Sequence, residues 1–414
     1  MNVLHINTTS HSGGAAIAAL RLVKAQNKQG TKADLLVAFK EKDHANIHSA
    51  YKFSSITWLF IYLEKLLFLF FEKDKTVRFS FSTGWFGRNI TKHPLVKQAD
   101  IIHLHWINNG FLSLENLKQL KKLNKPIVWT LHDMWAFTGG CHHAGSCTNF
   151  KNNCGNCYYL KTNNQSDLSN KIWLKKRNYF SEIPDLTITC SHWLEGKARM
   201  SSLFKNKNIV TIPNTINVEV YKPKNKEECK HLLGITTNKK YILFGAANIK
   251  SPYKGFDLFL EIIKKLQATW PENYELLIFG KCDDESINKI CVPHKYIGTV
   301  YGDENVVNVY NAAELLIFTS KEENLPNMIM ESMACGTPVI AFNIGGIGDL
   351  ITTETGTLVN SFDTEQFATG IRGYISDEKE TQIKSQKSVA AVNAYFSQAF
   401  VAQQTVQEYL KLTL

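Results

Sequence analysis

The sequence has few charged residues and no long uninterrupted apolar run. Of its 414 residues, 44% are hydrophobic and 20% are charged, a balance typical of a folded soluble protein. No window of about 18 uninterrupted apolar residues is present, which argues against a transmembrane helix. The first residues, Met1 to Ile6, lack the basic start and long apolar stretch of a signal peptide. The sequence therefore predicts a cytoplasmic protein.

Two further absences narrow the class of function. A G-x-G-x-x-G fingerprint is missing, which argues against a dinucleotide-dependent oxidoreductase. No zinc-finger, helix-turn-helix or RNA-recognition pattern accompanies the net charge of +10. Residues 1–222 hold 29 Lys+Arg against 14 Asp+Glu, whereas residues 223–414 hold 18 against 23. The basic first half suits an anionic membrane surface or a phosphorylated acceptor, and nucleic acid is the weakest of the three partners.

Apolar strands and helical stretches alternate along the chain, and the pattern starts again after a linker near Tyr221–Pro223. A chain of this length suits two domains of about 200 residues each. The first domain is predicted to have strands at 2–7, 33–39, 100–105, 126–131, 186–190 and 209–212, with helices at 15–29 and 113–123. The second is predicted to have strands at 241–245, 274–280, 315–319 and 339–342, with helices at 255–269, 303–312 and 326–335. Alternation of this kind predicts two doubly wound α/β domains with parallel sheets and a cleft between them.

Residues 314–350 carry the most informative motif, a strand, a turn, a helix, a second strand and a glycine turn. Glu323 and Glu331 bracket a helix expected to start near Pro326. Eight residues correspond to roughly 12 Å along an ideal helix, but Glu323 precedes the helix and can fold back over its N-terminus. Gly345-Gly346 supplies a permissive turn after the second strand. The pattern indicates a ligand site rather than an amphipathic helix with two solvated glutamates.

This motif resembles the donor-sugar site of retaining glycosyltransferases of the family 4 type, since Glu323, Pro326, Glu331, Met333–Gly336 and Pro338-Val339 all fall in register. The resemblance covers nearly the whole chain and is weakest over 40–98. It implies the GT-B architecture, with two Rossmann-like domains facing across a cleft. Residues 1–222 would bind the acceptor and 223–387 the nucleotide sugar, and a last helix within 388–414, over 388–412, would return to the first domain.

The resemblance also implies roles for individual residues. Glu323 would meet the donor sugar and Glu331 the ribose, while the helix N-terminus faces the diphosphate. Lys254 matches the basic residue that neutralises the diphosphate as the bond to the sugar breaks. The family's arginine shortly before this lysine is missing here, and Lys250 is the candidate substitute. Predicted donor-binding residues are Gly13, Gly14, Lys250, Lys254, Leu325, Pro326, Asn327, Met328 and Glu331.

His132 follows a predicted strand, at the end where open α/β sheets place ligands. It resembles the family's active-site histidine and is therefore a predicted catalytic residue together with Glu323 and Lys254. A structural strand-end histidine is the alternative. His103 and His105 point to the same side of another strand, and packing is the role expected for both.

The sequence thus predicts a metal-independent, retaining hexosyltransferase that uses a nucleotide diphosphate sugar as donor. The acceptor would be a glycan or a lipid-linked sugar in cell-surface polysaccharide biosynthesis, either exopolysaccharide or lipopolysaccharide. Thr138–Cys141 and the nearby cysteines look most like bacterial exopolysaccharide enzymes of the colanic-acid type. The alternatives are a GT-B sugar-nucleotide epimerase or phosphorylase, and an inactive membrane-associated scaffold of the same fold.

A strongly apolar segment, Trp58 to Phe71, is interrupted by Glu64-Lys65 and followed by Lys73, Lys75 and Arg78. It is too short and too interrupted to span a bilayer. An interfacial helix on an anionic membrane and a helix buried in the domain are both compatible with this pattern. The first alternative predicts a peripheral protein at the inner face of the cell membrane.

Four of the nine cysteines, Cys141, Cys147, Cys154 and Cys157, lie within 17 residues. Because Cys154 and Cys157 are separated by two residues, as in zinc knuckles, the cluster is a candidate structural zinc site. The first spacing is wider than usual, and His142 and His143 are competing candidate ligands; a loop of reduced thiols is the alternative.

Overall fold

Two parallel β-sheets, one in each half of the chain, organise the protein. A computed structural model describes residues 1–236 and 238–413. The chain divides into an N-terminal unit, Met1–Thr215 with Val401–Leu414, and a C-terminal unit, Ile216–Phe400. The sequence placed these limits at 222 and 387.

The N-terminal unit is built on a seven-stranded sheet of order β3-β2-β1-β4-β5-β6-β7, parallel throughout. Its strands are β1 (Asn2–Thr9), β2 (Lys32–Phe39), β3 (Ile47–Ser49), β4 (Ile101–Leu104), β5 (Ile127–Leu131), β6 (Leu186–Thr189) and β7 (Ile209–Thr211). Every residue of β4, β5 and β6 is buried, as expected for a sheet that helices cover on both faces. The predicted strands are found, and β3 is an additional one at the sheet edge.

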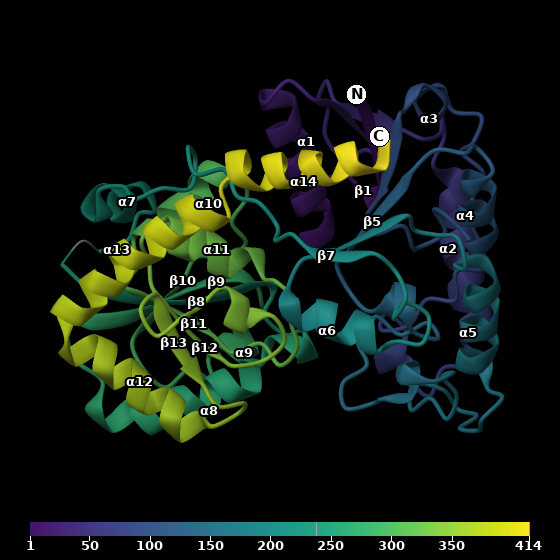
Figure 1. Cartoon of the computed structure of the whole chain (residues 1–414). Helices are drawn as coiled ribbons and strands as arrows, with labels where there is room; N and C mark the ends of the chain where they lie inside the picture. Colours follow the sequence, from purple (N-terminus) through teal and green to yellow (C-terminus); the bar gives the residue numbers. More distant parts are fainter. Residues whose placement is uncertain (237, 414) are drawn as a thin grey trace. The chain divides into compact units, whose positions relative to one another are not determined.

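Helices cover both faces of this sheet (Figure 1). They are α1 (Gly14–Lys28), α2 (Ser55–Phe68), α3 (Pro94–Gln98), α4 (Leu114–Lys121), α5 (Leu168–Tyr179), α6 (His192–Met200) and α14 (Gln398–Thr413). Figure 1 shows α1 and α14 on one face and α4 with α5 on the other. Short 3₁₀ turns, Lys75–Val77, Trp135–Phe137 and Asn149–Lys151, occur in the connections.

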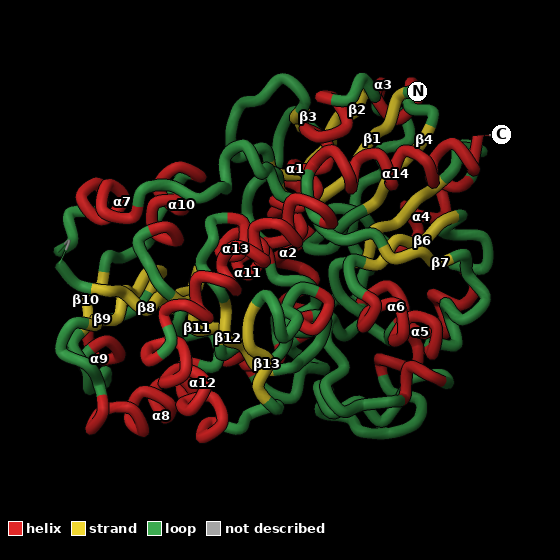
Figure 2. Tube along the Cα trace, turned by 60° about the vertical axis from the view of Figure 1, so that its left-hand side comes forward, coloured by secondary structure: helices red, strands yellow, loops and turns green. Residues whose placement is uncertain are grey.

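The C-terminal unit contains a six-stranded parallel sheet of order β10-β9-β8-β11-β12-β13, which Figure 2 shows side by side. Its strands are β8 (Lys240–Asn248), β9 (Tyr274–Lys281), β10 (His294–Tyr296), β11 (Leu315–Phe318), β12 (Val339–Phe342) and β13 (Gly356–Val359). Its helices are α7 (Lys226–Leu232), α8 (Phe256–Leu266), α9 (Asp284–Ile287), α10 (Asp303–Asn311), α11 (Asn327–Ala334), α12 (Thr364–Ser376) and α13 (Glu378–Tyr395). Strand order reverses between β8 and β11, the position at which such sheets bind ligands.

One predicted helix is wrong. Residues 388–412 were expected to form a single helix, but they contain the end of α13 and most of α14, which are separated at Phe396-Ser397. The Phe396 carbonyl accepts a hydrogen bond of 2.9 Å from the Ile216 backbone N–H, and Ser397 forms a parallel bridge with Ile216. These backbone contacts hold the chain out of helical geometry at the point where it leaves the C-terminal unit.

Helix α2 has two different faces. Ile61, Glu64 and Phe68 are buried, whereas Trp58 and Tyr62 are more than half exposed. The Glu64 carboxylate turns inward and accepts hydrogen bonds from the Thr83 and Gly84 backbone N–H groups and the Thr83 hydroxyl. Across the described residues, no helix is both long and apolar enough to cross a membrane.

Candidate active site

Lys254 and Glu323 meet at the carboxyl ends of β8 and β11. Lys254 ends a 3₁₀ turn, Pro252–Lys254, after β8, and Glu323 lies in the loop after β11. The Lys254 ammonium nitrogen lies 2.5 Å from Glu323 Oε1, and both side chains are partly buried. The two residues are 69 positions apart in the sequence. The structure therefore brings two of the predicted catalytic side chains together at the switch point of the sheet.

Two glycines with left-handed backbones allow these loops to approach. Gly255 has φ +66°, and a Cβ there would lie 1.9 Å from the Thr319 carbonyl oxygen. Gly345, from the predicted glycine turn, has φ +54°, and its Cβ would lie 1.8 Å from the Glu323 carbonyl oxygen. A side chain at either position would displace the loop that carries Lys254 or Glu323.

Glu331 lies on α11, which begins at Asn327 with Pro326 as its N-cap. Its side chain is buried, and Oε2 accepts a hydrogen bond of 3.0 Å from the Tyr310 hydroxyl. Burial and the neighbouring Glu331 charge hold the pKa of Tyr310 well above its usual range, so the phenol stays a donor. The two predicted glutamates thus have different surroundings, since Glu323 pairs with a cation and Glu331 with a neutral hydroxyl.

The remaining donor-site candidates are placed as follows. Leu325 and Pro326 are buried, whereas Asn327 and Met328 are partly exposed in the first turn of α11. Lys250, the candidate for the missing arginine, forms an exposed ion pair with Asp283. In this structure Lys250 therefore pairs with Asp283, whereas Lys254 pairs with Glu323.

The backbone of the predicted glycine loop is hydrogen-bonded to a carboxylate of the same chain, that of Glu41. Gly13, with φ +93°, caps α1, which begins at Gly14. Glu41 Oε2 accepts hydrogen bonds from the His11 and Ser12 backbone N–H groups at 2.6 and 2.9 Å. Burial alone would raise the pKa of Glu41, but these hydrogen bonds and the Ser12 hydroxyl lower it overall. The loop amides therefore point at a negatively charged group.

His132 follows β5 directly, as predicted, and it is partly exposed. Its Nε2 lies 3.1 Å from His105 Nδ1, and its Nδ1 lies 3.6 Å from Cys190 Sγ. Desolvation lowers the pKa of His132 to about 4, although the Asp133 charge opposes this shift. The ring is therefore neutral at physiological pH.

Next to His132, Asp133 anchors a polar network at the wall of a cavity. Its Oδ2 accepts from the His142 Nδ1–H and the Trp106 indole N–H at 2.7 and 3.0 Å. Burial would raise the pKa of Asp133, but His142 and the Trp135 backbone N–H lower it to about 2. His142 Nε2 in turn accepts from the Ser82 hydroxyl at 2.8 Å. This order of groups is that of a Ser-His-Asp triad, but the amides next to Ser82 are occupied by Glu64 and offer no oxyanion hole.

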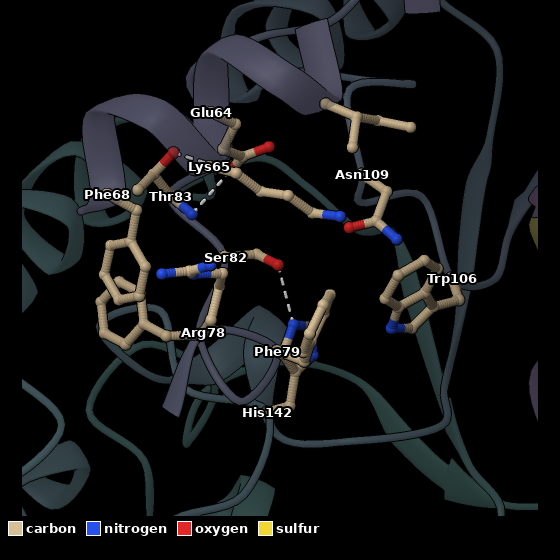
Figure 3. A pocket seen from close by; sticks show the side chains of 12 residues that line it. Glu64, Lys65, Phe68, Arg78, Phe79, Ser82, Thr83, Trp106, Asn109 and His142 are labelled. Atoms are coloured by element: carbon tan, nitrogen blue, oxygen red, sulfur yellow. Dashed lines mark hydrogen bonds between the residues drawn. The ribbon is translucent and has the colours of Figure 1, made fainter. Parts of the chain in front are cut away.

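The cavity has a volume of about 180 Å³ and combines aromatic, cationic and amide groups. Lys65 extends across it toward Asn109, above Ser82 and His142, as Figure 3 shows. Arg78 approaches from the other side, held by Glu72, and Trp106 forms part of the wall. A larger cavity of about 600 Å³ shares Ile61, Lys65 and Asn109 with it.

The four clustered cysteines line one small cavity and are free thiols. Burial raises the pKa of Cys154 to about 12 and that of Cys157 to about 11. Among residues 1–236 and 238–413, one group of three or more potential ligands has its ligand atoms within 4.8 Å, namely His5, His103 and His105. The four cysteine sulfurs do not form a second group of this kind within the described residues.

Comparison with protein families decides the class of this protein. The family described as Glycosyltransferase Family 4 matches residues 12–220, and the family described as Glycosyl transferases group 1 matches residues 239–377. The first match alone covers half of the chain. The chain belongs to glycosyltransferase family 4. The sequence-based assignment is confirmed, and the protein is a glycosyltransferase.

Relatives and solved structures agree with this assignment. The putative colanic acid biosynthesis glycosyl transferase WcaC of Escherichia coli K12 is 24% identical, over 99% of this chain and 98% of WcaC. HepE of Anabaena, solved in complex with UDP, has a TM-score of 0.66 at 15% identity, covering 99% of this chain and all of HepE. Sucrose-phosphate synthase of Thermosynechococcus elongatus has a TM-score of 0.70 at 16% identity, covering all of this chain and 99% of that protein. Together with the two parallel sheets, these likenesses confirm the GT-B fold.

Sequence reasoning missed several residues of this glycosyltransferase that contact or neighbour predicted site residues within one unit. Glu41 follows β2 and Tyr310 lies on α10, each far in sequence from the group it contacts. The Ser82–His142–Asp133 network was also missed, and only the closeness of Asp133 and His142 in sequence could have suggested it. His103 and His105 are buried as expected, but His105 also contacts His132.

Proposed function

We propose that the protein is a retaining glycosyltransferase that transfers a hexose-like sugar from a nucleotide diphosphate sugar. The Lys254–Glu323 pair at the β8–β11 switch point carries this proposal. Lys254 would stabilise the departing diphosphate without a divalent metal, since an ammonium placed where charge develops lowers the barrier. Glu323 would hold the sugar and Glu331 the ribose, with the α11 N-terminus facing phosphate. HepE, whose structures contain UDP and UDP-glucose, supports a donor of this class.

His132 is the proposed active-site histidine of the N-terminal unit. It follows β5, at the carboxyl ends of the strands, where parallel α/β folds bind ligands. The leaving diphosphate oxygen would assist removal of the acceptor proton, and no side-chain nucleophile is required.

The cavity around Lys65, Arg78 and Trp106 is the proposed acceptor site. An aromatic wall suits the apolar face of a sugar, and two cations suit the phosphates of a lipid-linked acceptor. The likeness to WcaC supports a role in cell-surface polysaccharide biosynthesis. A glycan or lipid-linked sugar is therefore the proposed acceptor class.

The exposed face of α2 supports attachment to an anionic membrane. Trp58 and Tyr62 of α2 are 59% and 62% exposed, and Phe70, two residues beyond the helix, is 72% exposed. Because Glu64 turns inward, its charge does not interrupt this face, and the exposed Lys73 and Lys75 follow the helix. Apolar area and positive charge both favour an anionic bilayer surface. We therefore propose a peripheral location at the inner face of the membrane.

A donor screen tests the proposed reaction. The full chain is incubated with a panel of UDP- and GDP-sugars and a mixture of glycan and lipid-linked acceptors, and released nucleoside diphosphate is measured. One donor should give turnover that depends on acceptor, and Lys254→Met should lower that turnover by about 100-fold or more.

Lys289→Met is the matched control, since this exposed lysine lies in the same unit and pairs with Glu285. It should leave turnover unchanged. Full activity of Lys254→Met, or an anomeric inversion in the product, would contradict the proposal.

A further inference from the structure

Three histidines form a buried row in the middle of the first sheet. The β1–β4 register places His5 beside His103, and the ring of His105, which directly follows β4, stacks on that of His103. Their exposed fractions are 0%, 0% and 3%. Neighbouring ring centroids are 4.4 to 5.2 Å apart. The row lies directly behind the predicted active-site residue His132.

Hydrogen bonds, rather than a metal ion, account for this cluster. His5 Nδ1 lies 2.9 Å from His105 Nε2, and His5 Nε2 lies 2.8 Å from Gln26 Oε1. His105 Nδ1 contacts His132, whereas His103 contacts the Tyr409 hydroxyl and, at 2.7 Å, the Thr130 hydroxyl. All six ring nitrogens of His5, His103 and His105 are therefore engaged. A metal would need their lone pairs and would break these bonds.

The groups at the ends of this network determine which nitrogen of each ring carries the proton. Gln26 Oε1 can only accept, so the proton of His5 lies on Nε2. The Gln26 amide nitrogen donates to Tyr409 Oη at 3.2 Å, which leaves the Tyr409 proton for His103 Nδ1. Desolvation lowers the pKa of His5 to about 4 and keeps the pKa of His105 well below its usual range. Each of these rings is therefore neutral and has one N–H to donate.

We propose that Gln26, acting through His5 and His105, holds His132 in the tautomer that carries its proton on Nε2. His5 Nδ1 accepts from His105 Nε2–H, and His105 Nδ1 accepts from His132 Nε2–H. The lone pair of His132 then lies on Nδ1, the nitrogen near the Cys190 thiol. Gln26, His5 and His105 are thus positioning residues for His132. Their relevance to sugar transfer rests on the proposed function of His132.

The chemical consequence concerns what His132 recognises. In this tautomer Nδ1 accepts a hydrogen bond and cannot donate one. The Cys190 thiol lies 3.6 Å from Nδ1 in this structure, and a substrate group that takes its place must bring its own proton, as a sugar hydroxyl does. A phosphate or carboxylate oxygen would be repelled by the same lone pair, so the relay favours a hydroxyl over an anion at this position.

Nitrogen chemical shifts measure the tautomer directly. The full chain is labelled with ¹⁵N-histidine, and two-bond ¹H–¹⁵N spectra distinguish protonated from unprotonated ring nitrogens. The signals of His132 are assigned by their loss in His132→Asn. At pH 7, His132 should show a protonated Nε2 and an unprotonated Nδ1. A protonated Nδ1 in the unchanged protein would overturn the proposal without any variant.

Three variants test the origin of this preference. Gln26→Leu removes the terminal acceptor, and the His132 signals should shift toward a mixture of both tautomers. Gln26→Glu keeps an acceptor at the same position and should retain the original pattern. Thr130→Val removes the hydrogen bond of His103, which lies off the path to His132, and should leave the His132 shifts unchanged. Unaltered His132 shifts in Gln26→Leu, or a reversed tautomer in Gln26→Glu, would overturn the proposal.

These spectra require neither a donor nor turnover. A failure of the relay would therefore appear as a wrong tautomer in a protein that still transfers sugar. A failure of the proposed function would appear as absent transfer in a protein whose His132 has the expected tautomer.

Discussion

At the residue scale, the two glutamates of the C-terminal unit differ in partner and burial. Glu323 pairs with Lys254, while the buried Glu331 accepts from Tyr310. Glu331→Gln keeps an acceptor for Tyr310 but loses the charge, and it should weaken free nucleotide binding by about 1.5–3 kcal/mol. Glu323→Gln should mainly lower turnover, because only contacts that strengthen during bond cleavage affect the chemical step.

Calorimetry with the free nucleoside diphosphate, together with kinetics on the full donor, supplies both quantities. Tyr310→Phe is the control for Glu331, since it removes the partner and keeps the carboxylate. Equal losses of nucleotide affinity in the two glutamate variants would show that the assigned roles are wrong.

At the scale of elements, α2 is the part of the N-terminal unit that is proposed to contact lipid. Phe70→Glu or Leu66→Glu should reduce flotation with phosphatidylglycerol vesicles at least about tenfold, because each variant removes apolar area and adds repulsion. High salt should weaken binding of the unchanged protein. Tyr301→Glu is the control, since Tyr301 is 78% exposed in the other unit. Equal flotation of all variants, or no flotation at low salt, would rule out this face.

The cysteine loop is a second element with a testable property. Cys154 and Asn156 have positive φ angles around Gly155, and the Gly139 N–H donates to Cys154 Sγ at 3.2 Å. This tight turn resembles the knuckle that presents two thiolates to zinc. Closure of the four thiols on an ion predicts one zinc per chain after purification without chelator. The double variant Cys154→Ser/Cys157→Ser should lose the metal, whereas the exposed Cys291→Ser should keep it.

Elemental analysis gives the zinc content of each protein. Well under one zinc per chain in the unchanged protein would leave a loop of reduced thiols as the correct description.

At the scale of the whole molecule, the buried histidines predict how stability depends on pH. The folded-state pKa values of His5 and His132 are lowered from about 6.5 to about 4. Their contribution to the free energy of unfolding is therefore complete above pH 6.5. It is lost as the pH falls toward 4, because the unfolded chain binds protons that the native state does not. Each histidine adds a slope of up to about 1.4 kcal/mol per pH unit in this window. Asp133, whose pKa is lowered from 3.8 to about 2, changes the free energy of unfolding only at pH values below about 3.8.

Urea unfolding between pH 4.5 and 7 measures this slope. Tryptophan fluorescence is the suitable probe, since all tryptophans except Trp270 lie within residues 1–215. Replacement of His5 by Gln should make the slope shallower. A free energy of unfolding that stays constant or rises on acidification would contradict the prediction.

The sequence by itself determined the interior strands and the family. β1, β4, β5, β8, β11 and β12 are buried apolar runs, and runs of this kind are set by local composition. β3, β10 and β13 lie at sheet edges, where short strands need no apolar pattern and leave a weaker signal. The spacing of Glu323, Pro326 and Glu331 was enough to indicate the family, because one loop and helix present these residues together.

Only the tertiary structure decided which groups contact one another. The Lys254–Glu323 pair spans 69 residues and the Gln26–Tyr409 bond spans 383. The inward turn of Glu64 and the break between α13 and α14 likewise depend on distant backbone groups. Local propensity cannot encode such contacts, because sheet register and helix packing fix them only after the chain has folded. Periodicity therefore specified the framework of this glycosyltransferase, while packing across the sheets selected the partners of its polar side chains.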